Sequence, residues 1–409
     1  MSDLSSKFID RIRAVIGDSE LANAGRPIGL HEPEIDELEK KYVLECLDST
    51  FVSSVGAFIP QLEQRIQEIT GAKHAIAVSN GTVGLQVALF LAGVEPGDEV
   101  IVPTLSFIAT ANAVSHAGAT PHFIDSELGT MGMSPEALRE ALAAMTITNG
   151  SGPGFGTNGM RVVNPATGAR IAAISPMHTL GHPVRIEEIC EIAAEYGIPV
   201  VEDAAESLGS FVTNKAGQSQ HTGTFGLTGM ISFNGNKIVT TGGGGVILTN
   251  DDELGKRAKH LTTTAKLAHK WEFEHDEIAW NYRMPNLNAA LGMAQLEKYP
   301  RFLEQKRRLA LAYGEAFANV DGLKFVFEPE GTVSNYWLCA VQLDDPSLAK
   351  RDEVMQAAHD AGLMVRPMWN LLHTQRMYTG APIGPVPTAT ALHASLICLP
   401  STPRLIAGI

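Results

Sequence analysis

Short apolar segments alternate with helix-like segments through the first half of the chain, and this alternation restricts the possible fold more strongly than composition does. The apolar segments have the length of buried strands and lie at residues 74–78, 99–103, 120–124, 171–174, 199–202 and 230–233. Helical spacing of apolar residues separates most of them, at residues 82–92, 107–117, 134–144 and 186–196. Apolar strands that alternate with helices indicate a mainly parallel sheet with helices on both faces.

The segments around this region indicate how the chain divides into domains. Two amphipathic helices are expected before it, at residues 33–48 and 60–70, and a stretch rich in Gly, Asn and Thr at about 145–169 favours an inserted loop or hairpin. Beyond Asn250 the order of elements changes, with helices at 251–261, 285–317 (one or two, interrupted near Pro300) and 347–361, and strands at 325–327 and 336–343. We therefore expect an N-terminal segment and large domain over residues 1–260, and linking helices with a small α+β domain over residues 261–409.

Charge and cysteine content argue against several classes of protein. Lys and Arg number 31 against 45 Asp and Glu, a formal net charge of -14, whereas a nucleic-acid-binding domain carries a basic face. The four cysteines form no CxxC pair, which argues against a disulfide scaffold or a structural zinc site. The N-terminal residues lack the apolar core of a signal peptide, and the apolar runs are too short to span a bilayer. We expect a cytoplasmic protein without nucleic acid, membrane or metal partners.

Lys237 stands between an apolar strand and four consecutive glycines, Gly242 to Gly245. A lysine in a pocket of low dielectric loses its proton readily and can act as a Schiff-base nucleophile. The alternative is a surface lysine before a flexible loop, and this segment alone favours neither interpretation.

Asp203 closes the apolar run that begins at Ile198, so it lies at the carboxyl end of an expected strand. Ligands of open α/β sheets bind beyond those ends, where a carboxylate can pair with a protonated ring nitrogen. Adjacent strand residues point to opposite faces, so Glu202 is expected to point away from the site. Taken alone, Asp203 is more typical of a helix cap or a solvated strand end than of a cofactor contact.

Ser79-Asn-Gly-Thr82 joins an expected strand to an apolar helix. Backbone N–H groups of Gly81 and Thr82 at a helix N-terminus can bind a phosphate, although an ordinary N-cap has the same composition. Ser232 can donate a hydroxyl to the same phosphate. Phe107 follows another strand end and can stack on an aromatic ring, or belong to the core.

Five segments, in this order, make the chain resemble the sugar-nucleotide aminotransferases of the DegT/DnrJ/StrS group. They are Ser79-Asn-Gly-Thr82, Pro103-Thr-Leu-Ser-Phe107-Ile-Ala-Thr110, Val201-Glu-Asp203-Ala-Ala-Glu-Ser-Leu-Gly209, Ser232-Phe-Asn-Gly-Asn-Lys237 with Gly242 to Gly245, and Asn281-Tyr-Arg-Met284 with Asn288-Ala-Ala290. The similarity covers about residues 28–400. It implies the aspartate-aminotransferase fold (PLP fold type I), the cofactor pyridoxal 5′-phosphate (PLP), and a homodimer with shared active sites.

The same resemblance assigns roles to individual residues. Lys237 would bond the cofactor and act as catalytic base and acid, and Asp203 would pair with the ring nitrogen. The phosphate would be held by Gly81, Thr82 and Ser232, with Phe107 covering the ring and Asn281 reaching the phosphate of the neighbouring subunit. Glu206 stands near the cofactor hydroxyl, where the family often has Gln or His.

Finer similarity points to one branch, the aminotransferases of bacillosamine and legionaminic acid biosynthesis. Their substrates are nucleotide-linked 4-keto-6-deoxy-N-acetylhexosamines, UDP- or GDP-linked, which gain an amine at C4 from glutamate. The resemblance is carried by His178-Thr-Leu-Gly-His-Pro183, the segment around Lys237, and residues 261–273. Expected substrate contacts are His178, Arg366 and His373. His178 and His182 have i,i+4 spacing, but the Gly and Pro beside them argue against a helical zinc pair.

Three alternative functions stay open on the sequence. A PLP-dependent sugar-nucleotide dehydratase shares the fold but usually has histidine in place of Lys237. A non-catalytic regulatory homologue would be expected to lose Asp203 or Lys237. A phosphate-binding module without PLP would leave Asp203 unexplained.

Overall fold

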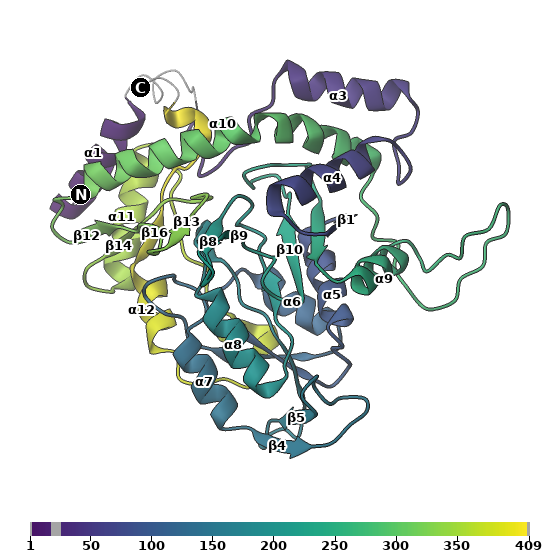
Figure 1. Cartoon of the computed structure of the whole chain (residues 1–409). Helices are drawn as coiled ribbons and strands as arrows, with labels where there is room; N and C mark the ends of the chain where they lie inside the picture. The colour runs from purple at the N-terminus through teal and green to yellow at the C-terminus, as the bar shows by residue number, and fades with distance from the viewer. Residues whose placement is uncertain (1, 18–25, 407–409) are drawn as a thin grey trace.

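The computed structural model describes residues 2–17 and 26–406, and Figure 1 shows a central sheet enclosed by helices, with a smaller sheet to one side. The central strands fall into two hydrogen-bonded groups, β3-β2-β6 and β7-β10-β11-β1, which isolated bridges between the ends of β6 and β7 connect. The bounds are β1 (His74–Val78), β2 (Glu99–Pro103), β3 (Thr120–Ile124), β6 (Ile171–Ile174), β7 (Val201–Asp203), β10 (Thr228–Ser232) and β11 (Gly245–Thr249). The sheet is mainly parallel, as predicted.

One strand was not predicted and runs against the others. β11 pairs antiparallel with both β10 and β1, and it begins at the last of the four glycines. The chain reverses between β10 and β11, and Gly242 has φ +77° in this reversal, a conformation that glycine adopts without steric cost. The turn carries Lys237, so the glycines shape the segment that positions the lysine.

Helices cover both faces of the central sheet. Four helices pack on one face: α4 (Phe58–Thr70), α7 (Pro135–Ala143), α8 (Ile186–Tyr196) and the first part of α10 (Asn286–Phe317). The other face carries α5 (Gly81–Leu91), α6 (Ile108–His116) and α9 (Asp252–Thr262). Val100 and Ile101, adjacent on β2, belong to opposite apolar clusters, which explains why these strands are apolar throughout.

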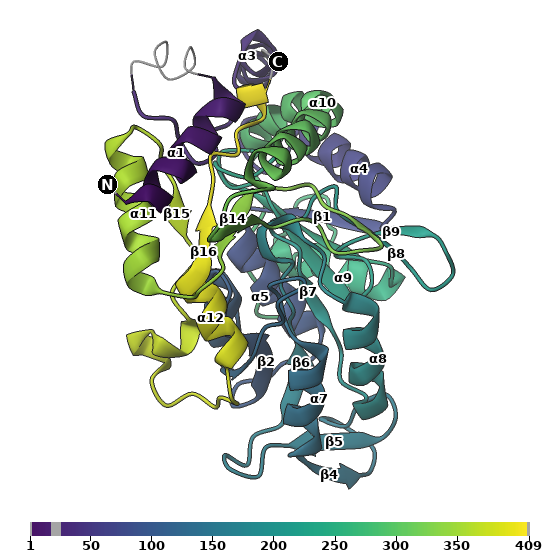
Figure 2. The ribbon, with the colours of Figure 1, turned by 90° about the vertical axis from the view of Figure 1, so that its left-hand side faces the viewer.

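A smaller antiparallel sheet of order β12-β14-β16-β15 lies beside the central one. Its strands are β12 (Leu323–Phe325), β14 (Ala340–Leu343), β15 (Arg366–Pro367) and β16 (Leu396–Cys398), and the neighbouring helices are α1 (Asp3–Ile16), α11 (Leu348–Asp360) and α12 (Pro387–Ser395). The apolar face of α1 packs against this sheet and the end of α10, so the N-terminal helix joins C-terminal elements (Figure 2). α10 runs unbroken past the exposed Pro300, and its two halves pack in the apolar clusters of the central sheet and of the smaller sheet. The interruption predicted near Pro300 was therefore wrong.

Short elements complete the described chain. They are α3 (Glu37–Asp48), β4 (Thr146–Asn149), β5 (Met160–Val163), β8 (Phe211–Thr213), β9 (Ser219–His221), β13 (Thr332–Val333), and 3-10 turns at Thr179–Gly181, Leu372–Thr374, Arg376–Tyr378 and Pro403–Ile406. The antiparallel pair β4–β5 forms the hairpin predicted within residues 145–169. In the described part of the chain, no helix combines the length and apolarity needed to cross a bilayer. The predicted division into domains at residues 1–260 and 261–409 stays a prediction. Within those two domains, residues 1, 18–25 and 407–409 lie outside the part of the chain that the structure describes.

Candidate active site

A cavity of about 300 Å³ opens at the carboxyl ends of β7 and β10, the edge where α/β sheets bind ligands. Segments far apart in the sequence meet there. The predicted site residues in its wall are Gly81, Thr82, Phe107, Asp203, Glu206, Ser232 and Lys237. The fold therefore brings seven of the predicted residues together, while their roles toward a cofactor stay predictions.

The Lys237 side chain is 10% exposed and reaches the cavity from the turn after β10. Its Nζ donates a hydrogen bond of 3.1 Å to Glu206 Oε1 and lies 3.8 Å from the ring centroid of Trp337. A carboxylate on one side and an aromatic face on the other fix the position of the amine. The burial of Lys237 excludes the alternative of a surface lysine, while its role as a nucleophile stays a prediction.

Two buried carboxylates face this lysine. Asp203 Oδ2 accepts a hydrogen bond of 2.7 Å from Thr110 Oγ1, and burial raises the pKa of Asp203 although this bond opposes the rise. Burial likewise raises the pKa of Glu206 to about 7, against the opposing charge of Lys237. Glu202 points the other way, as predicted, and accepts hydrogen bonds from backbone N–H groups of residues 223–226.

The N-terminus of α5 closes one end of the cavity beside Ser232. Asn80 caps this helix by accepting a hydrogen bond of 3.0 Å from the Val83 N–H, and the first-turn N–H groups of a helix have no partner within it. A Cβ added to Gly81 would lie 3.0 Å from the Ser232 Cβ, so glycine permits this close approach. Backbone donors, a hydroxyl and a helix N-terminus together suit a phosphate.

The remaining wall includes two tryptophans that the sequence interpretation did not select. Trp337 Nε1 donates a hydrogen bond of 2.7 Å to the Asn236 carbonyl, and Trp369 makes an edge contact with Phe107 at 6.2 Å between ring centroids. Both come from the C-terminal part of the chain, and an isolated tryptophan has no sequence signal that separates a cavity wall from a core. Phe107 itself is 47% exposed and lies over the cavity mouth rather than in the core.

Four predicted residues lie outside this cavity, and the first two along the chain are His178 and Asn281. His178 is fully buried, and its Nε2 lies 3.0 Å from Glu202 Oε2. The predicted direct contact between His178 and a substrate is therefore wrong. The pair supports β7 from its other face. Asn281 is exposed, and its Oδ1 accepts a hydrogen bond of 2.9 Å from Arg283 Nε. Its predicted contact with a neighbouring subunit stays a prediction.

The C-terminal residues Arg366 and His373 have different positions. Arg366 is exposed and lines a second depression of about 370 Å³, which shares Asn236, Trp337 and Trp369 with the candidate site. A substrate that extends from the first cavity can therefore reach it. His373 Nδ1 pairs with Thr104 Oγ1 at 2.7 Å, and the residue lines neither hollow, so its direct contact with substrate is not supported.

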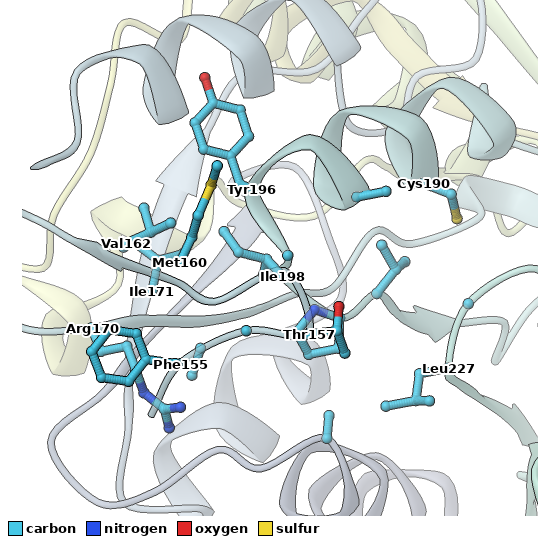
Figure 3. A pocket seen from close by; sticks show the side chains of 18 of the residues that line it. Phe155, Thr157, Met160, Val162, Arg170, Ile171, Cys190, Tyr196, Ile198 and Leu227 are labelled. Carbon is cyan, nitrogen blue, oxygen red and sulfur yellow. The ribbon is translucent and has the colours of Figure 1, made fainter. Parts of the chain in front are cut away.

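A larger cavity of about 550 Å³ lies at the amino ends of β6 and β7, away from Lys237 (Figure 3). Its wall combines the 154–157 turn of the hairpin insertion with Tyr196 and Ile198 after α8. Among the described residues that line it, Arg170 alone carries a charge, and its guanidinium is paired with Asp98 at 2.5 Å. The ionisable groups that suit chemistry are gathered in the smaller cavity.

Comparison with known proteins gives consistent matches. The profile of the DegT/DnrJ/EryC1/StrS aminotransferase family matches residues 33–407. GDP-perosamine synthase of Escherichia coli O157:H7 is 37% identical over 353 residues, which cover 86% of this chain and 87% of that protein. EpsN of Bacillus subtilis (strain 168), named as a pyridoxal phosphate-dependent aminotransferase, is 35% identical over 87% of this chain and 85% of its own length. The structure of the aminotransferase TlmJ from Streptoalloteichus hindustanus has a TM-score of 0.79 and 29% identity, covering 92% of this chain and 93% of that one.

Proposed function

The chain belongs to the DegT/DnrJ/EryC1/StrS aminotransferase family, and from this premise we propose that it transfers an amino group from glutamate to C4 of a nucleotide-linked 4-keto-6-deoxy-N-acetylhexosamine. It is a PLP-dependent sugar aminotransferase with the expected aspartate-aminotransferase-like fold. The observation that carries the proposal is the meeting of Lys237, Asp203 and the α5 N-terminus in one cavity.

The residues present fit PLP. The glycine at the start of α5, next to Ser232, leaves space and donors for its phosphate. The buried Asp203 carboxylate suits a protonated pyridine nitrogen, and the Lys237 amine suits its aldehyde. When bound, PLP supplies an electron sink that stabilises negative charge on the carbon next to the transferred nitrogen.

The protein supplies positioning and proton transfer. Lys237 is the group placed to remove and return the proton at the reacting carbon, because its amine is held inside the cavity. Asp203 would hold a proton on the ring nitrogen of the bound cofactor, since a nearby negative charge favours the protonated form. Aromatic side chains of Phe107, Trp337 and Trp369 line the cavity beside these groups and reduce their contact with water.

The finer choice of substrate has two candidates. The resemblance of residues 178–183 and 261–273 to the bacillosamine and legionaminic acid branch supports an N-acetylhexosamine. A relative named GDP-perosamine synthase, at 37% identity, supports a GDP-linked 4-keto-6-deoxy sugar instead. Both readings share amination at a keto carbon, and they differ in the nucleotide and in the acetamido group.

We also include a homodimer with shared active sites in the proposal. Its support is the exposed apolar surface of the loop after α9, where Trp271 is 69%, Phe273 79% and Ile278 97% exposed. Figure 1 shows this loop extending away from the rest of the chain. Asn281 follows it directly and lies outside its own chain's cavity, as expected of a residue that serves a second copy.

The test is an amination assay with glutamate and each keto sugar in turn. We expect a mass-identified 4-amino product from one of the UDP- or GDP-linked 4-keto sugars, and formation of 2-oxoglutarate in equal amount. Lys237→Ala is the control and should lack turnover. Turnover of Lys237→Ala at the wild-type rate, or no product from any 4-keto sugar, would contradict the assignment.

A further inference from the structure

The lysine and glutamate of the candidate site form a close pair with little access to water. Lys237 Nζ and Glu206 Oε1 are 3.1 Å apart, and the two side chains are 10% and 1% exposed. An ammonium and a carboxylate buried together lose much of their hydration, so the neutral pair of amine and carboxylic acid becomes competitive with the ion pair. A proton can pass between them along the existing hydrogen bond.

Glu206 is fixed in position by three separate contacts. Its Oε2 accepts a hydrogen bond of 2.9 Å from the Leu180 N–H, while its backbone carbonyl accepts one of 2.8 Å from Asn335 Nδ2. Oε1 is thereby directed at Lys237. The carboxyl group cannot turn away without losing the bond to Leu180, so it remains within reach of the amine.

The other groups that face the pair come from three elements. Asp203 at the end of β7 repels negative charge on Glu206, which favours its protonated form. Burial raises the pKa of the Cys398 thiol on β16, and burial lowers the pKa of His31 well below its usual value, so both stay neutral near pH 7. Burial also raises the pKa of Glu206 to about 7. The proton of the pair is therefore shared between Lys237 and Glu206, while Asp203 acts on them only through its charge.

We propose that Glu206 accepts a proton from the Lys237 ammonium and so supplies the neutral amine with which this lysine attacks a carbonyl carbon. One N–H bond of the ammonium breaks, one O–H bond forms at Oε1, and two opposite charges become a neutral pair. No oxidant or further reactant is needed. A glutamine at the same position would keep the shape and the hydrogen bond but could not take the proton.

The proposal rests on the assignment of Lys237 in the proposed function, but its test uses the cofactor-free protein and no sugar. If the amination assay fails but the labelling of Lys237 is independent of pH, the proposed proton transfer is still supported. If amination is normal but the labelling of Lys237 depends steeply on pH, the proposed role of Glu206 is contradicted while the proposed aminotransferase function is not.

The experiment measures the reactivity of Lys237 with formaldehyde and a borane reductant in short pulses, read by peptide mass spectrometry. The exposed Lys324 is the internal reference, and its labelling rate should rise steeply between pH 7.5 and 9.5, as expected for an amine in contact with water. A proton shared inside the pair makes the neutral fraction of Lys237 independent of pH. Its labelling rate should therefore change by less than about threefold over this range.

Glu206→Gln is the matched variant, and Lys324 in the same sample is its internal control. In this variant Lys237 can lose its proton only to water, and no carboxyl group returns it, so its labelling should change with pH and rise above the wild-type plateau once the amine is neutral. Glu206→Asp, one methylene shorter, should lower the level of the plateau and serves if the glutamine variant does not fold. A steep profile for Lys237 in the wild-type protein, or an unchanged plateau in Glu206→Gln, would overturn the proposal.

Discussion

At the scale of single residues, the adjacent carboxylates Glu202 and Asp203 at the end of β7 make different contacts on opposite faces of the strand. Glu202 accepts hydrogen bonds from three backbone N–H groups on one side of the strand and pairs with His178. Asp203, on the other side, faces the cavity with one side-chain donor, Thr110. The alternation of side chains along a strand therefore separates a carboxylate that supports the fold from one that faces the cavity.

Thr110→Val should shift the pH dependence of activity. The hydrogen bond from Thr110 lowers the pKa of Asp203, so its loss raises that pKa further. Activity that needs ionised Asp203 is lost as pH falls through its pKa, so the acidic limb of kcat/KM should move to higher pH. We expect about one pH unit, because a hydrogen bond to a charged group is worth about 1.5 kcal/mol or more.

Thr110→Ser keeps the hydroxyl and is the control for this shift. Its acidic limb should coincide with that of the wild-type enzyme. If Thr110→Val also leaves the limb in place, Asp203 is not the ionising group that controls this side of the profile.

At the scale of elements, the site depends on how closely α5 and β10 approach each other and on how α10 supports the aromatic wall. Gly81 begins α5 against Ser232 and Met230 of β10. On the opposite side, the buried Lys306 of α10 donates hydrogen bonds to the carbonyls of Trp337 at 2.9 Å and Ser401 at 2.6 Å. The helices therefore set the position of both walls.

Gly81→Ala should weaken cofactor binding. The added Cβ would lie 3.0 Å from the Ser232 Cβ and 3.1 Å from the Met230 Sδ, so the start of α5 must move outward. We expect the Kd of PLP to rise about tenfold, equivalent to about 1.4 kcal/mol, in an absorbance titration. Gly129→Ala, where the added Cβ meets open space, should leave the Kd unchanged. Equal Kd values for both variants would contradict the contact argument.

Lys306→Met should flatten the pH dependence of stability. Burial lowers the pKa of Lys306 to about 7, so between pH 7 and its unfolded pKa the unfolded chain binds one more proton than the folded chain. The contribution of Lys306 to the free energy of unfolding therefore rises with pH in that window, by at most about 1.4 kcal/mol per pH unit. Urea unfolding of both proteins at pH 7, 8 and 9 should show a growing difference. A constant difference would mean that Lys306 keeps its charge in the fold.

For the molecule as a whole, exposed apolar side chains gather on two surfaces. One is the loop after α9, and the other comprises Leu44, Leu47, Phe51, Val52 and Val55 of α3 and the segment after it. Arg257 of α9 forms an ion pair with Glu277, and His260 Nε2 lies 2.7 Å from Asp276 Oδ1, so α9 holds the base of the loop. An anchored loop with an apolar tip is suited to packing against a second copy of this chain.

Mixed dimers test whether active sites are shared. Lys237→Ala and Asn281→Ala proteins should each have little activity alone. If Asn281 completes the partner's site, a mixture allowed to exchange subunits contains heterodimers with one intact site each. Activity should then recover to about a quarter of the wild-type value, as random pairing in a two-fold dimer predicts. Activity equal to the mean of the two parents would contradict shared sites.

Local pattern was sufficient for most individual elements. The strands at 74–78, 99–103, 120–124 and 171–174 and the helix at 186–196 were predicted with the bounds observed, because each is a short apolar or amphipathic run with clear ends. β11 was not predicted, because it begins at the last of four consecutive glycines, a residue type that is rare in strands. Pro300 did not interrupt α10, because packing along both halves of the helix outweighs the lost hydrogen bond.

The sequence by itself determined the type of sheet and the family resemblance, because apolar periodicity and ordered motifs can be read from residue order. The resemblance, rather than any single motif, then selected Lys237, Asp203, Gly81, Thr82 and Ser232 as candidate site residues. Tertiary structure alone decided what surrounds them. It buried His178 behind β7, placed Trp337 against the lysine from a distant segment, and set Glu206 within 3.1 Å of Lys237. Burial and distance between remote segments fix the charge state of a group, and neither quantity can be read from residue order.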